Sequence, residues 1–198
     1  MALIAKNRLR EADAELARLR TLVNDPSLKT QVTFSTNTGY AVLRIAPEVV
    51  AGGIAARRKQ WSTALLHLER AVRYEDALIY QEPSDWHAPV RQNLGAVLLA
   101  AGRPDEAEAV YWEDLRKNPG TGWALYGLLR ALQAQGKADE ATLVEATLQG
   151  SVEGLRRHAP SIGARHFSGA LTESANVAAA PLKWRALKRA STESLTRH

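Results

Sequence analysis

Few residues in this 198-residue sequence are of a type and spacing that could do chemistry. The chain has no cysteine, which excludes a disulfide framework, a thiolate zinc site and a cysteine nucleophile. No two histidines have the four-residue separation of a helical zinc-hydrolase motif; the five histidines are His67, His87, His158, His166 and His198. We therefore expect neither a bound metal nor a cofactor.

Carboxylates gather around one turn-rich stretch of the chain, at Glu75, Asp76, Glu82 and Asp85. Paired carboxylates do acid–base work only where burial in a cleft shifts their pKa values. Pro83 and Ser84 favour a turn, so we expect a solvated loop in which Asp85 caps the next helix. The glycines of residues 120–127 resemble a phosphate loop, but no strand precedes them and no Gly-Lys-Ser/Thr follows. We do not expect an enzyme.

An internal repeat is the clearest pattern. Residues 94–107 align without gaps with residues 128–141, and the spacing from Gly102 to Gly136 is 34 residues. In both stretches an apolar helical pattern ends at a glycine, which can take a positive φ, and a polar first turn follows. The pattern predicts two helical hairpins of equal length.

Residues 88–121 resemble a tetratricopeptide (TPR) repeat, and residues 122–150 resemble a degenerate copy of one. The packing positions of that family are occupied in the first unit by Leu94, Gly95, Leu98, Ala107, Tyr111 and Pro119. Arg91 departs from the family, which usually has a large apolar residue there. The resemblance implies an all-α fold, a right-handed solenoid of helical hairpins.

Two fainter units precede these repeats. Residues 45–87 form a degenerate repeat with an insertion near residues 74–86, and this part is similar to the C-terminal repeats of longer bacterial TPR proteins of unassigned function. An amphipathic helix over residues 8–23 has the register of a second helix, so residues 1–26 form a partial repeat. We expect this uncapped end to belong to a longer protein or to pair with another chain.

The C-terminal region differs in composition. The helical period is lost beyond Gly150, and residues 155–198 hold eight Lys/Arg and two acidic residues, whereas residues 1–154 carry a net charge of −1. We expect a domain over 1–150 and a basic, mostly disordered tail over 151–198. A basic patch in the tail offers an alternative function, association with nucleic acid or an anionic membrane; it consists of Lys183, Arg185, Lys188 and Arg189.

No apolar run reaches the roughly 20 residues of a membrane span, and the N-terminus lacks a secretory pattern. We expect a cytoplasmic protein with no integral membrane segment. Because the domain is nearly neutral, we do not expect it to bind nucleic acid.

The resemblance also implies a binding site. First helices line the groove of such solenoids, and here they would present Gln92, Asn93, Ala96, Trp123, Tyr126, Arg130 and Gln133. Asn93 and Arg130 match two positions of a carboxylate clamp, but Tyr126 replaces its lysine, so we do not expect a working clamp. The predicted function is a scaffold that binds a protein or peptide, with aromatic anchors among Trp86, Trp112, Trp123 and Tyr126.

Overall fold

The computed structural model describes residues 1–32 and 36–158 of the chain. The regular structure of these residues is helical, apart from one isolated antiparallel bridge between Val32 and Thr38. This confirms the predicted all-α class. The helices are α1 (Ala2–Ala5), α2 (Leu9–Val23), the short 3-10 helix η1 (Pro26–Lys29), α3 (Gly39–Leu43), α4 (Ile45–Arg57), α5 (Trp61–Asp76), α6 (Val90–Ala100), α7 (Pro104–Lys117), α8 (Gly122–Ala134) and α9 (Ala138–His158).

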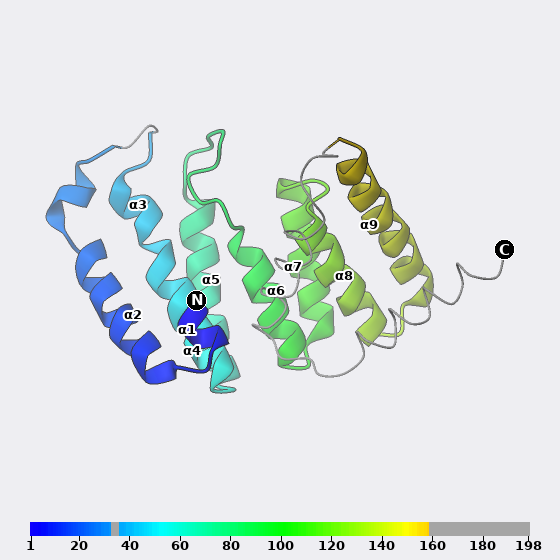
Figure 1. The fold of residues 1–198 in the computed structure, drawn as a ribbon, viewed down its shortest axis with the longest axis horizontal. Coiled ribbons are helices and arrows are strands. Elements are labelled where there is room, and N and C mark those ends of the chain that lie inside the picture. The colour runs from blue at the N-terminus through cyan, green and yellow to red at the C-terminus, as the bar shows by residue number, and fades with distance from the viewer. Residues whose placement is uncertain (33–35, 159–198) are drawn as a thin grey trace.

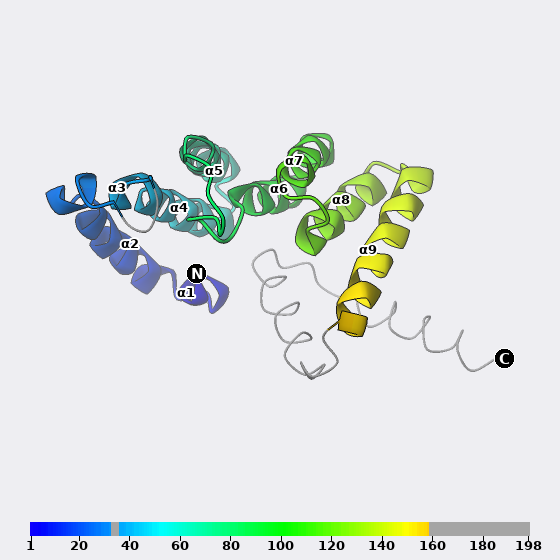
Figure 2. The ribbon, with the colours of Figure 1, turned by 90° about the horizontal axis from the view of Figure 1, so that it is seen from above.

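The helices form a row in chain order (Figure 1). Seen from above, the row is an arch in which α4, α6 and α8 lie on the inner side and α5 and α7 on the outer side (Figure 2). Each inner helix packs against the outer helix that follows it, and α6 also contacts both α4 and α8. The inner helices therefore form a continuous layer.

The same turn joins the two helices of four successive hairpins. At each turn one residue has positive φ, and the next amide donates to a carbonyl five residues earlier, a pattern that ends a helix by satisfying its last carbonyls. The donor and acceptor pairs are Arg8–Leu3, Gln60–Ala55, Arg103–Leu98 and Lys137–Leu132, at 2.8–3.0 Å. Gly102 and Gly136 take φ of 76° and 75°, in agreement with the sequence pattern, whereas the two earlier turns use Asn7 and Lys59, both at 59°.

Buried side chains form two clusters that meet at α4. The larger cluster runs from α4 to α9 and includes Ile45, Leu68, Val90, Leu128 and Leu132. The smaller one joins α1, α2 and α4 through Ile4, Ala12, Leu16, Ala51 and Ile54. The segment Gly39–Arg57 is long and apolar enough to cross a membrane by length and composition alone, and half of it is buried inside the protein. Its apolar character is accounted for by this position between the two clusters.

Two features differ from the sequence pattern. Helix α9 continues to His158, so the domain boundary predicted at Gly150 falls inside a helix. The insertion between α5 and α6 is held to the loop before α3 by Asn37, whose side chain is 5% exposed. Asn37 accepts from the backbone N–H of Ile79 at 2.9 Å and donates to its carbonyl at 2.8 Å. The side-chain amide of Asn37 therefore makes the same two hydrogen bonds to the Ile79 backbone that a neighbouring strand would make.

Candidate binding surface

The predicted groove residues lie on two adjacent inner helices. Gln92, Asn93 and Ala96 are on α6, and Trp123, Tyr126, Arg130 and Gln133 are on α8. Because α6 contacts α8, the structure places both sets on the same layer. Arg130 and Gln133 are exposed, Trp123 is 36% exposed, and the remaining four are half-buried. We call these seven residues the inner face.

One inner-face residue is used for internal bonding. Gln92 donates through Nε2 to Oδ2 of Asp114 at 3.1 Å. By contrast, Asn93, Trp123, Arg130 and Gln133 make no side-chain hydrogen bond or ion pair within the part of the chain that the structure describes. These four side chains keep their bonding capacity for a ligand, whereas Gln92 serves the fold.

The tyrosine of the first repeat sets the distance between α6 and α8. Tyr111 on α7 is 3% exposed, and its ring lies against Gly95 of α6 and Gly127 of α8. A Cβ atom at either glycine would lie 2.5 Å or less from Cζ of Tyr111. Both glycines are needed for this close approach. Burial raises the pKa of the Tyr111 hydroxyl, so the ring stays neutral.

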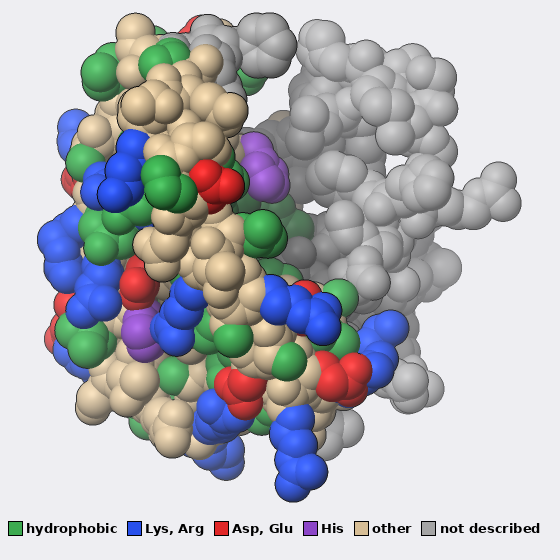
Figure 3. Space-filling view, turned by 90° about the vertical axis from the view of Figure 1, so that its left-hand side faces the viewer, with side chains coloured by type: hydrophobic (Ala, Val, Ile, Leu, Met, Phe, Trp, Pro, Cys, Tyr) green, Lys and Arg blue, Asp and Glu red, His purple; other side chains and the backbone are tan. Residues whose placement is uncertain are grey.

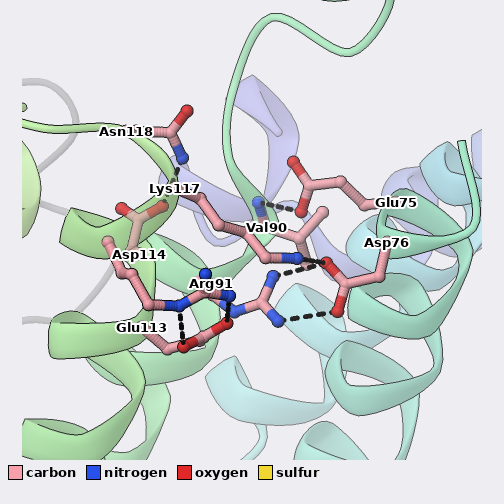
Figure 4. A network of polar contacts seen from close by, with 9 residues as sticks. Glu75, Asp76, Val90, Arg91, Glu113, Asp114, Lys117 and Asn118 are labelled. Atoms are coloured by element: carbon pink, nitrogen blue, oxygen red, sulfur yellow. Dashed lines mark hydrogen bonds and ion pairs between the residues drawn. The ribbon is translucent and has the colours of Figure 1, made fainter. Parts of the chain in front are cut away.

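A polar network joins the end of α5, the start of α6 and the end of α7 (Figure 4). Arg91 of α6 donates two hydrogen bonds of 2.7 Å to the carboxylate of Asp76 at the end of α5. Lys117 at the end of α7 pairs with the same carboxylate at 2.5 Å. The side chain of Arg91 is 11% exposed. The bidentate pair with Asp76 satisfies the guanidinium and accounts for an arginine at this largely buried position.

The acidic cluster is only in part the solvated loop that we predicted, because Glu82 alone is both exposed and on the loop between α5 and α6. Glu75 and Asp76 belong to the last turn of α5, and Glu75 accepts from the backbone N–H of Val90 at 3.0 Å. The carboxylate at the first amide of α6 is therefore that of Glu75, not Asp85. Asp85 accepts instead from Nδ2 of Asn37 at 2.8 Å, because the insertion folds back onto the loop before α3.

The two neighbouring carboxylates have pKa values shifted in opposite directions. Burial raises the pKa of Glu75 to about 7, against the weaker opposing effects of the Val90 amide and Arg91. Hydrogen bonding to Arg91 lowers the pKa of Asp76 to about 2, with a smaller contribution from Lys117. The separation follows from environment, since Asp76 has two cationic partners and Glu75 has a backbone amide.

These shifts predict a pH-dependent stability. The folded protein binds a proton at Glu75 more readily than the unfolded chain, so the contribution of Glu75 to stability falls as pH rises from about 4.5 to about 7. Asp76 has the opposite sign and a separate window, because its contribution is lost only as pH falls from about 4 toward 2. We expect Glu75→Gln to remove the first dependence. Between pH 4.5 and pH 8, we expect the free energy of unfolding of Glu75→Gln to rise by about 1–2 kcal/mol relative to that of the wild type. The gain is this small because solvent reaches part of the carboxyl group.

Urea unfolding at pH 4.5, 6 and 8 measures this effect. Glu69→Gln is the matched control, because Glu69 is an exposed residue of the same helix. A Glu75→Gln profile parallel to the wild-type profile across this range would show that Glu75 titrates normally in the folded protein.

The other tryptophans differ in position. Trp86 packs against the core, and its Nε1 is buried, so it is a core residue rather than an anchor. Trp112 is 51% exposed on α7, in the outer layer and away from the inner face. Of the four predicted anchors, Trp123 and Tyr126 remain on the surface that we describe as the inner face.

A pocket among the described residues lies away from the inner face. A cavity of about 140 Å³ opens between α2, α4 and α5, with Leu16, Ala51 and Ala55 among its lining residues. His67 lies at its wall and is bonded to Glu48 at 2.6 Å. Residues 1–32 and 36–158 hold no group of three or more His, Cys, Asp or Glu side chains that could bind a metal ion.

The N-terminal end of the row presents a charged surface (Figure 3). On α2 the exposed positions include Arg10, Glu11, Glu15 and Arg18, and Arg18 pairs with Glu15 at 2.9 Å. Basic and acidic side chains are interspersed over this view, and hydrophobic ones are scattered (Figure 3).

The basic patch Lys183, Arg185, Lys188 and Arg189 lies outside the described residues, as do His166 and His198. No protein-family model matches the chain, and comparisons with curated proteins and with solved structures give no match.

Proposed function

We propose that this protein is a TPR-type scaffold, a right-handed solenoid that binds a protein or peptide through its inner face. One observation carries the proposal: Asn93, Trp123, Arg130 and Gln133 lie on adjacent inner helices and have no internal bonding partner in the described chain. Aromatic and arginine side chains of this kind are enriched among the residues that dominate binding energy. The four equivalent turns and the 34-residue spacing support the solenoid.

The proposed ligand is an extended or helical peptide rather than a small molecule. The inner face runs across two helices, and the cavity of about 140 Å³ is not part of it. Asn93 and Gln133 offer amide groups that can bond a peptide backbone, while Trp123 and Tyr126 offer apolar area. The role needs no cofactor and no catalysis, and we place it in the cytoplasm.

Peptide selection on the purified full chain tests the proposal. We expect a phage-displayed peptide library to yield binders whose affinity, measured by calorimetry, falls at least about tenfold in Arg130→Glu and in Trp123→Ala. Leu66→Ser is the matched control, because Leu66 is 51% exposed on the outer helix α5. Binders that are insensitive to both inner-face variants would contradict the proposal.

The charge distribution favours one alternative. Residues 155–198 carry a net charge of +6, so association with nucleic acid or an anionic membrane through the tail is the second proposal. Deletion of residues 159–198 abolishes binding under this alternative and preserves it under the first.

Self-association through the N-terminal unit is also a proposal, and light scattering of the full chain measures it. The charged face of α2 argues for a monomer.

A further inference from the structure

A cationic side chain without an anionic partner lies at the junction of α3 and α4. Arg44 is half-buried, and its guanidinium carbon lies 4.3 Å from the ring centroid of Tyr74 and 5.9 Å from that of Tyr40. The Nζ atom of Lys29 lies 5.8 Å from the centroid of the same Tyr40 ring. We call Lys29, Tyr40, Arg44 and Tyr74 the Arg44 cluster.

The donors of Arg44 are not satisfied by the described chain. Arg44 makes no hydrogen bond or ion pair with residues 1–32 or 36–158, and its Nε is buried from solvent. Buried donors are normally bonded, and leaving one unmet is costly. Stacking on Tyr74 attracts the cation to the ring face but does not use the N–H groups in the guanidinium plane.

The nearest carboxylates along α4 and α5 are already engaged. Glu48 pairs with His67 at 2.6 Å and Arg70 at 3.6 Å. Glu75 accepts from the Val90 amide, and Asp76 is shared by Arg91 and Lys117. No carboxylate in the described chain forms an ion pair with Lys29 or Arg44, so the positive charge of the cluster is not compensated by an ion pair.

Exposed apolar side chains lie on the segments that adjoin the cluster. Leu43, which precedes Arg44, is 40% exposed, and Val32 and Ile79 are 56% and 59% exposed. Val32 pairs with Thr38 at the start of α3, and Ile79 is bonded to Asn37, so both lie on loops attached to this corner of the protein. An anionic group flanked by apolar groups matches this surface better than a free ion does.

We propose that the Arg44 cluster, with Leu43, Val32 and Ile79, is a second docking surface for an acidic segment of a partner protein. A glutamate or aspartate carboxylate of that segment accepts from the terminal Nη groups of Arg44, which are not buried as Nε is, with Lys29 adding charge attraction. Apolar side chains of the same segment cover Leu43 and its neighbours. The surface is formed by η1, α3, the residue between α3 and α4, α5 and two adjoining loops, and it shares no residue with the inner face.

Nitrogen-15 NMR of the full chain tests this site through the Nε–Hε resonance of Arg44, which is assigned by its loss in Arg44→Met. The probe is acetyl-Glu-Leu-Glu-Leu-Glu amide, its counterpart is the same peptide with glutamine at each glutamate, and sodium acetate represents the free anion. We expect a saturable shift with the acidic peptide, at a Kd below about 1 mM, and at least tenfold weaker binding of the glutamine peptide.

The variants are chosen to separate this site from the inner face. Lys29→Met and Arg44→Met should each lower the affinity for the acidic peptide, measured from the shifts of the backbone amides of α3. The exposed control Arg18→Met and the inner-face variant Arg130→Glu should leave this affinity unchanged. In Arg44→Met the methionine keeps an unbranched chain against the Tyr74 ring. Lys29→Met is expected to fold, because Lys29 is exposed. The proposal is overturned if both variants bind normally, if no shift occurs up to about 5 mM peptide, or if acetate binds as tightly as the peptide.

Discussion

Replacing Gly127 by alanine is expected to lower the free energy of unfolding by about 2–3 kcal/mol, although alanine is the better helix former. Gly127 lies inside α8, and a Cβ atom there would be 2.1 Å from Cζ of Tyr111. The Tyr111 ring cannot move away, because Gly95 of α6 closes the other side, where a Cβ would lie 2.5 Å from the same atom. The cost is therefore a forced separation of α6 and α8.

A double-mutant cycle measured by urea unfolding tests this explanation. In a Tyr111→Ala background the added Gly127→Ala substitution should cost little, because the clashing ring is gone. Gly150→Ala is the matched control; among the described residues, no atom outside its own stretch of helix lies within 4 Å of the added Cβ, and we expect it to stabilise α9 by up to about 1 kcal/mol. An equal cost of Gly127→Ala in both backgrounds would show that Tyr111 does not set the helix spacing.

Replacing Asp114 by alanine is expected to cost about 2–4 kcal/mol. Asp114 of α7 is 0% exposed and accepts from Gln92 at 3.1 Å and from Nδ2 of Asn118 at 2.8 Å. Alanine leaves both half-buried amide groups without this acceptor and also leaves a void. The loss would loosen the connection of α6 to the turn between α7 and α8.

Asparagine at position 114 separates these causes. Asp114→Asn keeps the volume and one acceptor oxygen, so we expect a smaller loss of about 1 kcal/mol. Asp105→Ala is the control, because Asp105 is exposed in the first turn of the same helix and should cost under about 1 kcal/mol. Losses from Asp114→Ala no larger than those from Asp105→Ala would contradict a structural role for the buried carboxylate.

The helical class and the turns at Gly102 and Gly136 could be predicted because glycine marks a position of positive φ. At the equivalent turns, asparagine at position 7 gives only a weak signal of positive φ, and lysine at position 59 gives none, because lysine at positive φ is uncommon and is set by the hairpin around it. That the same turn occurs four times is therefore visible only in the backbone hydrogen bonds of the structure.

The positions of the inner-face residues followed from the repeat register, but their bonding did not. Gln92 shares a face with Asn93 in sequence, yet it bonds Asp114, a residue 22 positions later. Likewise Lys117 reaches Asp76 across 41 residues, so the acidic cluster looked exposed when judged only by its local turn residues. Pairings between helices depend on packing, which a linear pattern does not specify.

The most direct test of the binding proposal uses the tryptophans, since three of them report on different parts of the chain: Trp123 on the inner face, Trp112 on the outer helix α7, and Trp184 within the basic residues 155–198. The full chain, labelled with nitrogen-15, is titrated with a selected peptide while the indole N–H resonances are followed. The proposal predicts that the Trp123 resonance shifts with saturation while those of Trp112 and Trp184 stay in place. A shift of Trp184 or Trp112 with Trp123 unmoved would contradict it and place the binding site elsewhere.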